Sequence, residues 1–329
     1  MKVLVTGAAG FLGGRVIKGL LSNSGGAAEV SRIVAADTVP CPIADPRVDS
    51  RIGSIVQPEF IRSIVEPDVD VVFHLAAVLS GQSEADFDLA LRVNVDGTRN
   101  LLEACRSLGR PPRFVFSSTV AIFGVDLPEV VPENSVLQPR STYGTTKVIG
   151  ELLVSEYSRR GFVDGVSCRL ATVTVRPGAP NSALSSFVSG IIREPLAGLD
   201  AICPVPLDTR LWISSPAVVT HNLLHAARVP ASALDGRAAV NLPGLCVTPA
   251  QMLASLERAG GAAARARVRT EVDPAVARIV FTWPGALDDS RARGLGFAAD
   301  RDVDEIVRQY MEEHRSGAVA RGSESSAGF

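Results

Sequence analysis

A glycine loop between a short apolar run and a helical pattern is the feature that most restricts how this chain can fold. Residues 2–7 read KVLVTG, which is typical of a buried strand, and residues 11–22 have the apolar spacing of a helix. Between them, Gly7, Gly10 and Gly13 form a G-x-x-G-x-x-G spacing. Such a loop can be an ordinary turn, but its place between a strand and a helix is typical of a dinucleotide site. The sequence therefore predicts a dinucleotide-binding βαβ unit at the start of the chain.

The rest of the first half alternates short apolar runs with helical patterns. The pattern predicts strands at residues 32–37, 70–78, 113–119 and 165–173, and helices at residues 58–66, 84–109 and 143–161. This alternation is typical of a parallel sheet that helices cover on both faces. We therefore expect an α/β protein built on a Rossmann-type doubly wound parallel sheet.

After about residue 175 the pattern loosens, and prolines separate short elements. We expect residues 1–175 to form the nucleotide-binding domain. Residues 176–315 are predicted to form a smaller C-terminal substrate-binding lobe, with some segments returning to the main sheet and helices at 248–260 and 302–313. Residues 316–329 are rich in Gly, Ser and Ala, a composition that predicts a disordered tail.

Composition excludes several classes of function. The 329 residues carry a net charge of −2 without a dense basic run, which argues against a nucleic-acid partner. No apolar run reaches the roughly 18 residues of a membrane helix. The five cysteines are scattered and odd in number, as expected for reduced thiols. We expect a cytoplasmic protein that binds neither nucleic acid nor membrane.

An acidic residue ends the second predicted strand. The carboxylate of Asp37 can accept hydrogen bonds from the adenosine ribose hydroxyls, and it would repel a 2′-phosphate. No basic residue directly follows it, and the next one is Arg47. The sequence therefore favours NAD over NADP, the alternative being that Asp37 only caps a turn.

Five short motifs occur in a fixed order over residues 1–175, and two of them contain chemically reactive residues. The motifs read GAAGFLG, HLAAV, RVNVDGT, FSST followed by IFG, and YGTTK. Tyr143 and Lys147 in the last motif are one helical turn apart. By itself this spacing is typical of a solvated helix face. Together the motifs resemble the extended short-chain dehydrogenase/reductase family, the relatives of nucleotide-sugar epimerases. The resemblance implies a catalytic triad of Thr119, Tyr143 and Lys147.

The triad's residue types suit the oxidation of an alcohol. A free tyrosine has a pKa of about 10, and nearby positive charge lowers it. We expect Lys147 and the nicotinamide ring to favour the phenolate of Tyr143, which takes the alcohol proton as hydride leaves. Thr119 would hydrogen-bond the reacting oxygen, and Lys147 would also hold the nicotinamide ribose.

The resemblance also implies a set of residues around NAD. These are Gly7, Gly10, Phe11, Leu12, Gly13, Asp37, Ser54, Ile55, Leu75, Ala76, Ala77, Asn94, Ser117, Tyr143, Lys147, Ala171 and Val173. Ser54 stands where the family usually has an aspartate. His74 is interpreted as a packed strand residue. His221 and His225 have metal-like spacing but no evident third ligand, so no metal site is expected.

The second half departs from the nucleotide-sugar enzymes of the family. Thr172, Ser214 and Pro216 replace their usual Asn, His and Asp, although Arg210 matches their phosphate-contacting arginine. Instead, AAVLSG, VRPGAPNSALSSFVSGIIREPLAG, DTRLWISSP and NLPGL resemble a branch that oxidises the C2 hydroxyl of a four-carbon sugar acid with NAD. We therefore expect a small sugar acid as the substrate.

Arginines and hydroxyls are the candidate substrate ligands. The expected set is Ser80, Ser118, Thr119, Tyr143, Arg176, Ser185 and Arg210. Arg176 or Arg210 would bind the carboxylate unless it pairs with an acid of the protein, and Arg210 is slightly preferred. The alternatives are an epimerase with tightly bound NAD and a non-enzymatic redox-sensing binder, against which the intact triad argues. The family resemblance also implies a homodimer.

Overall fold

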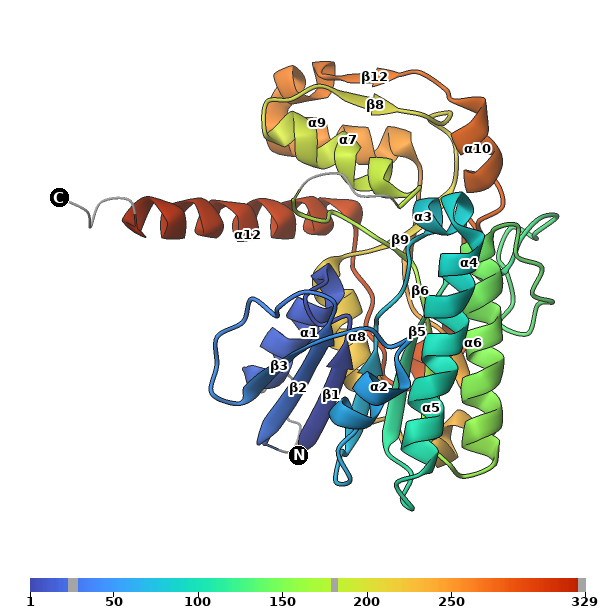
Figure 1. The fold of residues 1–329 in the computed structure, drawn as a ribbon. Coiled ribbons are helices and arrows are strands. Elements are labelled where there is room, and N and C mark those ends of the chain that lie inside the picture. The colour runs from blue at the N-terminus through green and yellow to red at the C-terminus, as the bar shows by residue number, and fades with distance from the viewer. Residues whose placement is uncertain (23–28, 179–182, 325–329) are drawn as a thin grey trace.

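The computed structural model describes residues 1–22, 29–178 and 183–324 and is built around a seven-stranded parallel sheet (Figure 1). Its order is β10-β6-β5-β4-β1-β2-β3. The strands are β1 (Lys2–Thr6), β2 (Arg32–Asp37), β3 (Val48–Ile52), β4 (Val71–His74), β5 (Arg113–Thr119), β6 (Asp164–Leu170) and β10 (Ala239–Asn241). Because the strand order reverses beside β1, a crevice is expected at the carboxyl end of that strand. The predicted Rossmann-type α/β fold is confirmed.

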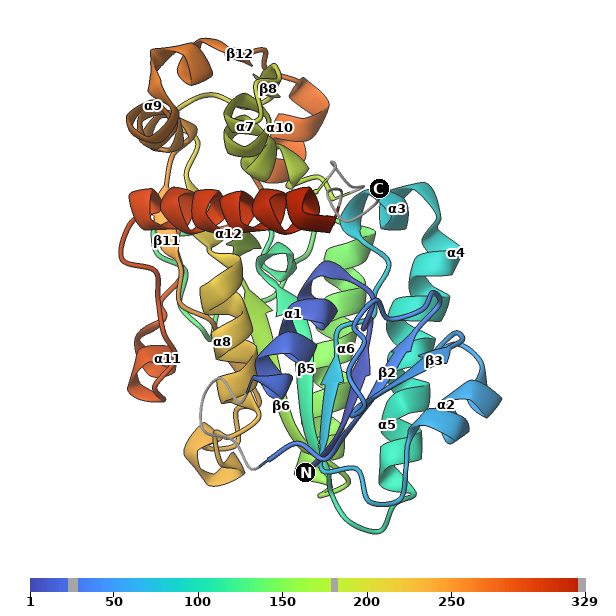
Figure 2. The same cartoon turned by 90° about the vertical axis from the view of Figure 1, so that its left-hand side faces the viewer.

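Helices cover both faces of this sheet (Figure 2). On one face lie α1 (Phe11–Leu21) and α8 (Pro216–Ala226), and on the other lie α2 (Pro58–Ile64), α5 (Thr98–Arg106) and α6 (Thr142–Arg159). Successive strand residues point to opposite faces of the sheet. Val5 therefore packs in the core under α1 and α8, whereas Leu4 packs in the core under α2 and α5. This explains why the central strands are continuously apolar.

The helix predicted at 84–109 is divided into several pieces. The structure has α3 (Ser80–Ala85), α4 (Phe87–Ala90), a π-helical segment (Leu91–Gly97) and then α5. Asp86 separates α3 from α4, because its carboxylate caps α4 by accepting from the N–H of Leu89 at 2.9 Å. The π-helical segment contains Asn94, and such segments are frequent at functional sites.

The smaller lobe has its own core and two small sheets. One sheet pairs β7 (Thr172–Val173), β9 (Leu211–Ser214) and β11 (Leu245–Val247), and the other pairs β8 (Ala201–Cys203) with β12 (Val268–Thr270). Its helices are α7 (Ser186–Leu196), α9 (Pro249–Ala266), α10 (Pro274–Val280) and α12 (Val303–Glu324). In the second half, β10 joins the main sheet and α8 packs against it. The short α11 (Ser290–Gly294) contacts β10.

Helix α12 extends into the segment that composition predicts to be disordered. The helix continues to Glu324, and residues 325–329 lie outside the described residues. The segment contains Ala, Arg and Glu, which are good helix formers, so a continued helix is compatible with its sequence. Over the described ranges, none of the helices combines the length and apolarity that crossing a membrane would require.

A buried ion pair fastens α6 to the sheet. Arg169 on β6 donates from Nη2 to Glu151 Oε2 on α6 at 2.9 Å and from Nε to Glu151 Oε1 at 3.0 Å. The two side chains are only 7% and 5% exposed. The same guanidinium donates to the carbonyl of Glu133 at 2.9 Å and to Asn241 Oδ1 at 3.3 Å. Because α6 carries Tyr143 and Lys147, this pair fixes the helix that the triad depends on.

We expect Arg169→Ala to lower the free energy of unfolding by roughly 3–5 kcal/mol, because it leaves the Glu151 carboxylate buried without its partner. Arg159→Ala is the matched control, since Arg159 forms an exposed pair with Glu156 at 2.7 Å on the same helix. Urea denaturation of both variants measures the difference. Equal, small losses would contradict the structural role of the buried pair.

Candidate active site

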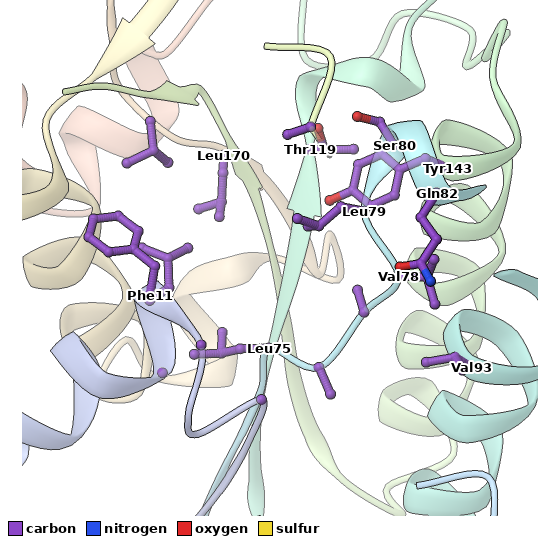
Figure 3. A pocket seen from close by; sticks show the side chains of 18 of the residues that line it. Phe11, Leu75, Val78, Leu79, Ser80, Gln82, Val93, Thr119, Tyr143 and Leu170 are labelled. Atoms are coloured by element: carbon purple, nitrogen blue, oxygen red, sulfur yellow. The ribbon is translucent and has the colours of Figure 1, made fainter. Parts of the chain in front are cut away.

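A cavity of about 720 Å³ opens where several parallel strands end. Its wall includes residues at the carboxyl ends of four strands, namely Gly7 after β1, Asp37 on β2, Leu75 after β4 and Thr119 on β5. This is the position at which open α/β sheets bind ligands. Figure 3 shows Tyr143, Thr119 and Ser80 together in the cavity wall, apart from Phe11 and Leu75.

Two positions of the glycine loop are too tightly packed for any residue other than glycine. Gly7 has a φ of +72°, and a Cβ there would lie 2.7 Å from the N atom of Ala76. A Cβ on Gly13 would lie 2.1 Å from the carbonyl oxygen of Gly7. Gly10 is the N-cap of α1 and has no side-chain cap. The first turn of α1 thus faces the cavity with free N–H groups, as binding of a pyrophosphate requires.

Asp37 is joined directly to this loop. Its Oδ2 accepts from the N–H of Ala9 at 3.0 Å, and its Oδ1 accepts from the N–H of Thr38 at 2.7 Å. Oδ1 also accepts from Thr38 Oγ1 at 3.3 Å, whereas Oδ2 has a further lone pair for a ribose hydroxyl. Arg47, the next basic residue after Asp37, pairs with Asp45 at 2.9 Å and does not line the cavity. The turn-capping role and the ribose role of Asp37 are therefore compatible.

One end of the cavity suits a flat base. Ser54 and Ile55 line it, and so do Gly53, Thr38 and Val39, which the sequence did not single out. A Cβ on Gly97 would lie 2.7 Å from the Ile55 Cδ1 atom, so this glycine gives Ile55 its place. The Ser54 hydroxyl accepts from the N–H of Val56 at 3.3 Å.

Three predicted cofactor residues lie behind the cavity wall and support it. Asn94 is buried, accepts from the N–H of Val78 at 2.8 Å and donates to Thr146 Oγ1 at 3.1 Å. Ser117 donates to the carbonyl of His74 at 3.2 Å. The third residue is Lys147. None of the three is part of the cavity lining. The remaining predicted cofactor residues all line the cavity.

The triad is assembled from β5 and the first turn of α6. Ser141 caps α6 by accepting from the N–H of Gly144 at 3.0 Å, which starts the helix just before Tyr143. One turn later, Lys147 donates from Nζ to the carbonyl of Ser117 at 2.7 Å. Its Nζ lies 5.7 Å from the centroid of the Tyr143 ring. Thr119, at the end of β5, lines the same cavity.

Burial favours the neutral form of both titrating residues of the triad. Burial raises the pKa of Tyr143 to about 12, and the positive charge of Arg176 opposes this shift. Burial also lowers the pKa of Lys147 to about 7, against the opposing effect of the Glu151 carboxylate. Arg176 is thus a further cation that favours the phenolate, beside Lys147 and the nicotinamide ring to which the sequence interpretation assigned that effect.

The expected substrate residues separate into two groups. Ser80, Ser118, Thr119, Tyr143, Arg176 and Ser185 line the cavity, whereas Arg210 does not. The 39% exposed side chain of Arg210 pairs with Glu129 at 3.3 Å, and its Nε donates to Cys246 Sγ at 3.3 Å. The preference for Arg210 over Arg176 therefore has no support from the geometry.

Arg176 has the features of an anion ligand. Helix α7 fixes its backbone, because Ser189 Oγ accepts from its N–H at 3.0 Å and Arg193 Nη1 donates to its carbonyl at 2.8 Å. Within the described part of the chain, its buried Nη2 has no hydrogen-bond partner, and neither has the buried Ser118 Oγ. Buried polar groups of this kind are usually satisfied, so both atoms are suited to a ligand.

Sequence reasoning missed two large polar or aromatic residues of the lining, Gln82 and Trp283. Gln82 lies on α3, which is tied to α6 because Glu84 Oε1 accepts from the N–H of Thr142 at 2.6 Å. Trp283 follows α10 in the smaller lobe. The only local signal was the rarity of tryptophan, which occurs twice in the sequence.

The histidines have structural positions. His74 is buried and hydrogen-bonds with Thr6 Oγ1 at 2.7 Å and Thr98 Oγ1 at 2.8 Å. Burial lowers its pKa to about 3, so it is neutral. His225 contacts the carbonyl of Leu295 through Nε2 at 2.8 Å. Over the described ranges, no group of three or more metal-ligating side chains gathers around a possible ion.

The sequence and the fold match known proteins. The profile of the NAD dependent epimerase/dehydratase family matches residues 3–213. D-erythronate dehydrogenase of Cupriavidus necator is 48% identical over 95% of this chain and 98% of its own length. The D-erythronate dehydrogenase of Haemophilus influenzae is 43% identical over 95% and 99%.

Solved structures agree with this match. The crystal structure of a nucleoside-diphosphate-sugar epimerase from Agrobacterium tumefaciens has a TM-score of 0.91 and 38% identity, covering 96% of this chain and 95% of that one. L-threonine 3-dehydrogenase from Trypanosoma brucei has a TM-score of 0.85 and 26% identity, covering 94% and 96%. With the glycine loop, Asp37 and the triad in place around one cavity, the chain belongs to the NAD-dependent epimerase/dehydratase family.

Proposed function

We propose that this protein is an NAD-dependent dehydrogenase that oxidises the C2 hydroxyl of a small sugar acid, converting D-erythronate to 2-dehydro-D-erythronate. The observation that carries the proposal is the half-buried Arg176, whose buried Nη2 has no hydrogen-bond partner among the described residues and which lines the same cavity as Tyr143 and Thr119. A carboxylate next to a secondary alcohol would satisfy all three groups. Two relatives above 40% identity bear the name D-erythronate dehydrogenase.

The residues present fit NAD. The glycine loop leaves no room for a Cβ at Gly7 or Gly13, and this close packing lets a pyrophosphate approach the backbone. The carboxylate of Asp37 suits a ribose diol and repels a 2′-phosphate. Bound here, NAD would supply a nicotinamide ring that accepts the hydride from the substrate.

The chain's own residues handle the proton. Tyr143 Oη removes it from the C2 hydroxyl, while the hydroxyl of Thr119 donates a hydrogen bond to the same oxygen. Lys147 donates from Nζ to the carbonyl of Ser117, and in its protonated form it adds a positive charge 5.7 Å from the centroid of the Tyr143 ring. Arg176 orients the carboxylate and also favours the phenolate form of Tyr143.

The size of the cavity favours a small substrate. A volume of about 720 Å³ must hold the dinucleotide as well as the substrate. A pocket for a single drug-sized ligand is roughly 300–1,000 Å³. Little of the volume is therefore left for a second nucleotide, which supports the sugar acid over a nucleotide sugar. The homodimer and the cytoplasmic location stay predictions from the resemblance and the composition.

We expect Tyr143→Phe to reduce turnover of D-erythronate by at least about a hundredfold, because it removes the base and keeps the ring. The wild-type rate should rise with pH, since only the phenolate accepts the proton and burial raises the pKa of Tyr143. NADH absorbance measures both, and retained NAD affinity is the control. Near-normal turnover in the variant would contradict the triad, and no net NADH formation by the wild type would favour an epimerase.

Asp37→Ala should weaken NAD binding and reduce discrimination against NADP, because the variant loses both the ribose acceptor and the charge that repels a 2′-phosphate. Steady-state kinetics with the two cofactors measure the change. Asp45→Ala is the matched control, since Asp45 pairs with Arg47 outside the cavity lining. Equal use of NAD and NADP by the wild type would contradict this role of Asp37.

Arg176→Ala should reduce kcat/KM for D-erythronate roughly tenfold to a hundredfold, because a hydrogen bond to a charged group contributes about 1.5–3 kcal/mol. Its pH profile should also move to higher pH, because the variant lacks the cation that opposes the raised pKa of Tyr143. Arg258→Ala is the control and should show neither effect, because Arg258 forms an exposed pair with Asp304 at 2.6 Å outside the cavity lining. Uncharged erythritol should be a poor substrate that Arg176→Ala affects less. Equal losses on both substrates would contradict carboxylate binding by Arg176.

A further inference from the structure

One aromatic side chain of the smaller lobe reaches the cavity from far along the chain. Among the described residues, Trp283 is the single member of the cavity lining that follows Ser185. It lies just after α10, and its backbone N–H donates to the carbonyl of Val280 at 3.0 Å. The indole is half-buried and packs against the core of the smaller lobe. Trp283 therefore forms a wall that the nucleotide-binding half does not supply.

The segment after Trp283 is fixed to the loop between β5 and α6. The N–H of Val131 donates to the carbonyl of Ala286 at 2.9 Å, and the N–H of Asp288 donates to the carbonyl of Val131 at 2.9 Å. Val131 and Leu287 form a parallel β-bridge. The loop from Thr119 to Tyr143 thus holds the segment that carries the indole, so Trp283 is positioned together with the triad.

Arg210 contributes to the same arrangement. A Cβ on Gly285 would lie 2.6 Å from the Cβ of Arg210, so this glycine allows the segment to pass closely over the arginine. Arg210 in turn pairs with Glu129, two residues before Val131. These contacts hold Trp283 in one place before any ligand binds, and such preorganisation lowers the cost of recognition. They also give Arg210 a structural task outside the cavity.

The chemistry of the two walls is complementary to a short polyhydroxy acid. Hydroxyls and a guanidinium come from Ser80, Ser118, Ser185 and Arg176, whereas Trp283 supplies a broad apolar face and one N–H donor. Figure 1 shows α10 on the side of the smaller lobe that faces α3 and the start of α6, which carry Ser80 and Tyr143. Trp283 comes shortly after α10, so the segment that carries it starts on this side of the smaller lobe.

We propose that Trp283 closes the substrate end of the cavity and sets the length of sugar acid that the enzyme accepts. Its face packs on the C–H groups of a four-carbon chain whose carboxylate is held by Arg176, and it occupies the space that a fifth and sixth carbon would need. This inference rests on the proposed function, because it assigns chain-length selection to the same site.

The test compares D-aldonates of four, five and six carbons in the wild type, Trp283→Ala and Trp283→Phe, with NADH absorbance as the readout. In Trp283→Ala, kcat/KM for the five-carbon acid relative to the four-carbon acid should rise at least about tenfold, the usual scale for one carbon in a shaped pocket. Trp283→Phe retains an aromatic wall and should keep the preference for four carbons. Trp212→Phe is the matched control, because Trp212 is buried outside the lining and donates to the carbonyl of Leu242 at 3.4 Å.

A binding readout covers the case in which Trp283→Ala does not fold. The sequence has two tryptophans, so Trp212→Phe leaves Trp283 as the sole one. In the Trp212→Phe/Tyr143→Phe protein with NAD, D-erythronate should change the tryptophan emission in a saturable way. Unchanged emission, or equal loss on all chain lengths in an active Trp283→Ala enzyme, would overturn the inference and leave the proposed function standing. A wild type that oxidises no sugar acid would overturn the proposed function itself.

Discussion

The close approach of three backbone segments at the carboxyl end of β1 is the constraint on which the whole site depends. Gly7 lies against the N atom of Ala76, and Gly13 lies against the carbonyl of Gly7, so strand β1, helix α1 and the loop after β4 meet without intervening side chains. Asp37 joins the same point through the N–H of Ala9. A single methyl group at either glycine would separate these segments. The phosphate, ribose and base regions would then lose their common frame.

A layer of buried polar groups connects these segments by hydrogen bonds to α6, the helix that carries Tyr143 and Lys147. Neutral His74 connects Thr6 on β1 with Thr98 on α5, and Asn94 connects Val78 with Thr146 on α6. The hydrogen bonds satisfy most of these groups, so the layer can be buried without a large penalty. The π-helical segment that carries Asn94 is what brings this amide between the loop and the catalytic helix.

The sequence predicted best the relative positions of residues that lie close together along the chain. The glycines, Asp37 and the Tyr143–Lys147 pair each lie within one loop, one strand end or one helical turn, so their geometry follows from the element that contains them. The choice between Arg176 and Arg210 could not be predicted in this way. Both follow irregular segments, and distant partners decide which one reaches the cavity, with Glu129 and Cys246 holding Arg210 outside it.

Three other features could not be predicted from the sequence, each for a different physical reason. Trp283 lines the cavity from a segment that Val131, far away in the sequence, holds through Ala286 and Asp288, and no periodicity marks it. The break at Asp86 depends on a capping bond that competes with a helical pattern, and the sequence pattern alone favoured one continuous helix. The Gly, Ser and Ala composition of the last residues predicts disorder, and α12 is drawn out to Glu324 within that segment.

The burial of the two titrating triad residues also links the folding equilibrium to proton uptake. Burial lowers the pKa of Lys147 from its ordinary 10.5 to about 7, so between these values the unfolded chain binds more protons and stability rises with pH. Burial raises the pKa of Tyr143 from 10 to about 12, so above pH 10 the folded chain binds more protons and stability falls. Taken alone, the pair places its most favourable contribution to folding near pH 10. At neutral pH the ammonium form of Lys147 is therefore a net cost to the fold, which the packing of α6 against the sheet offsets.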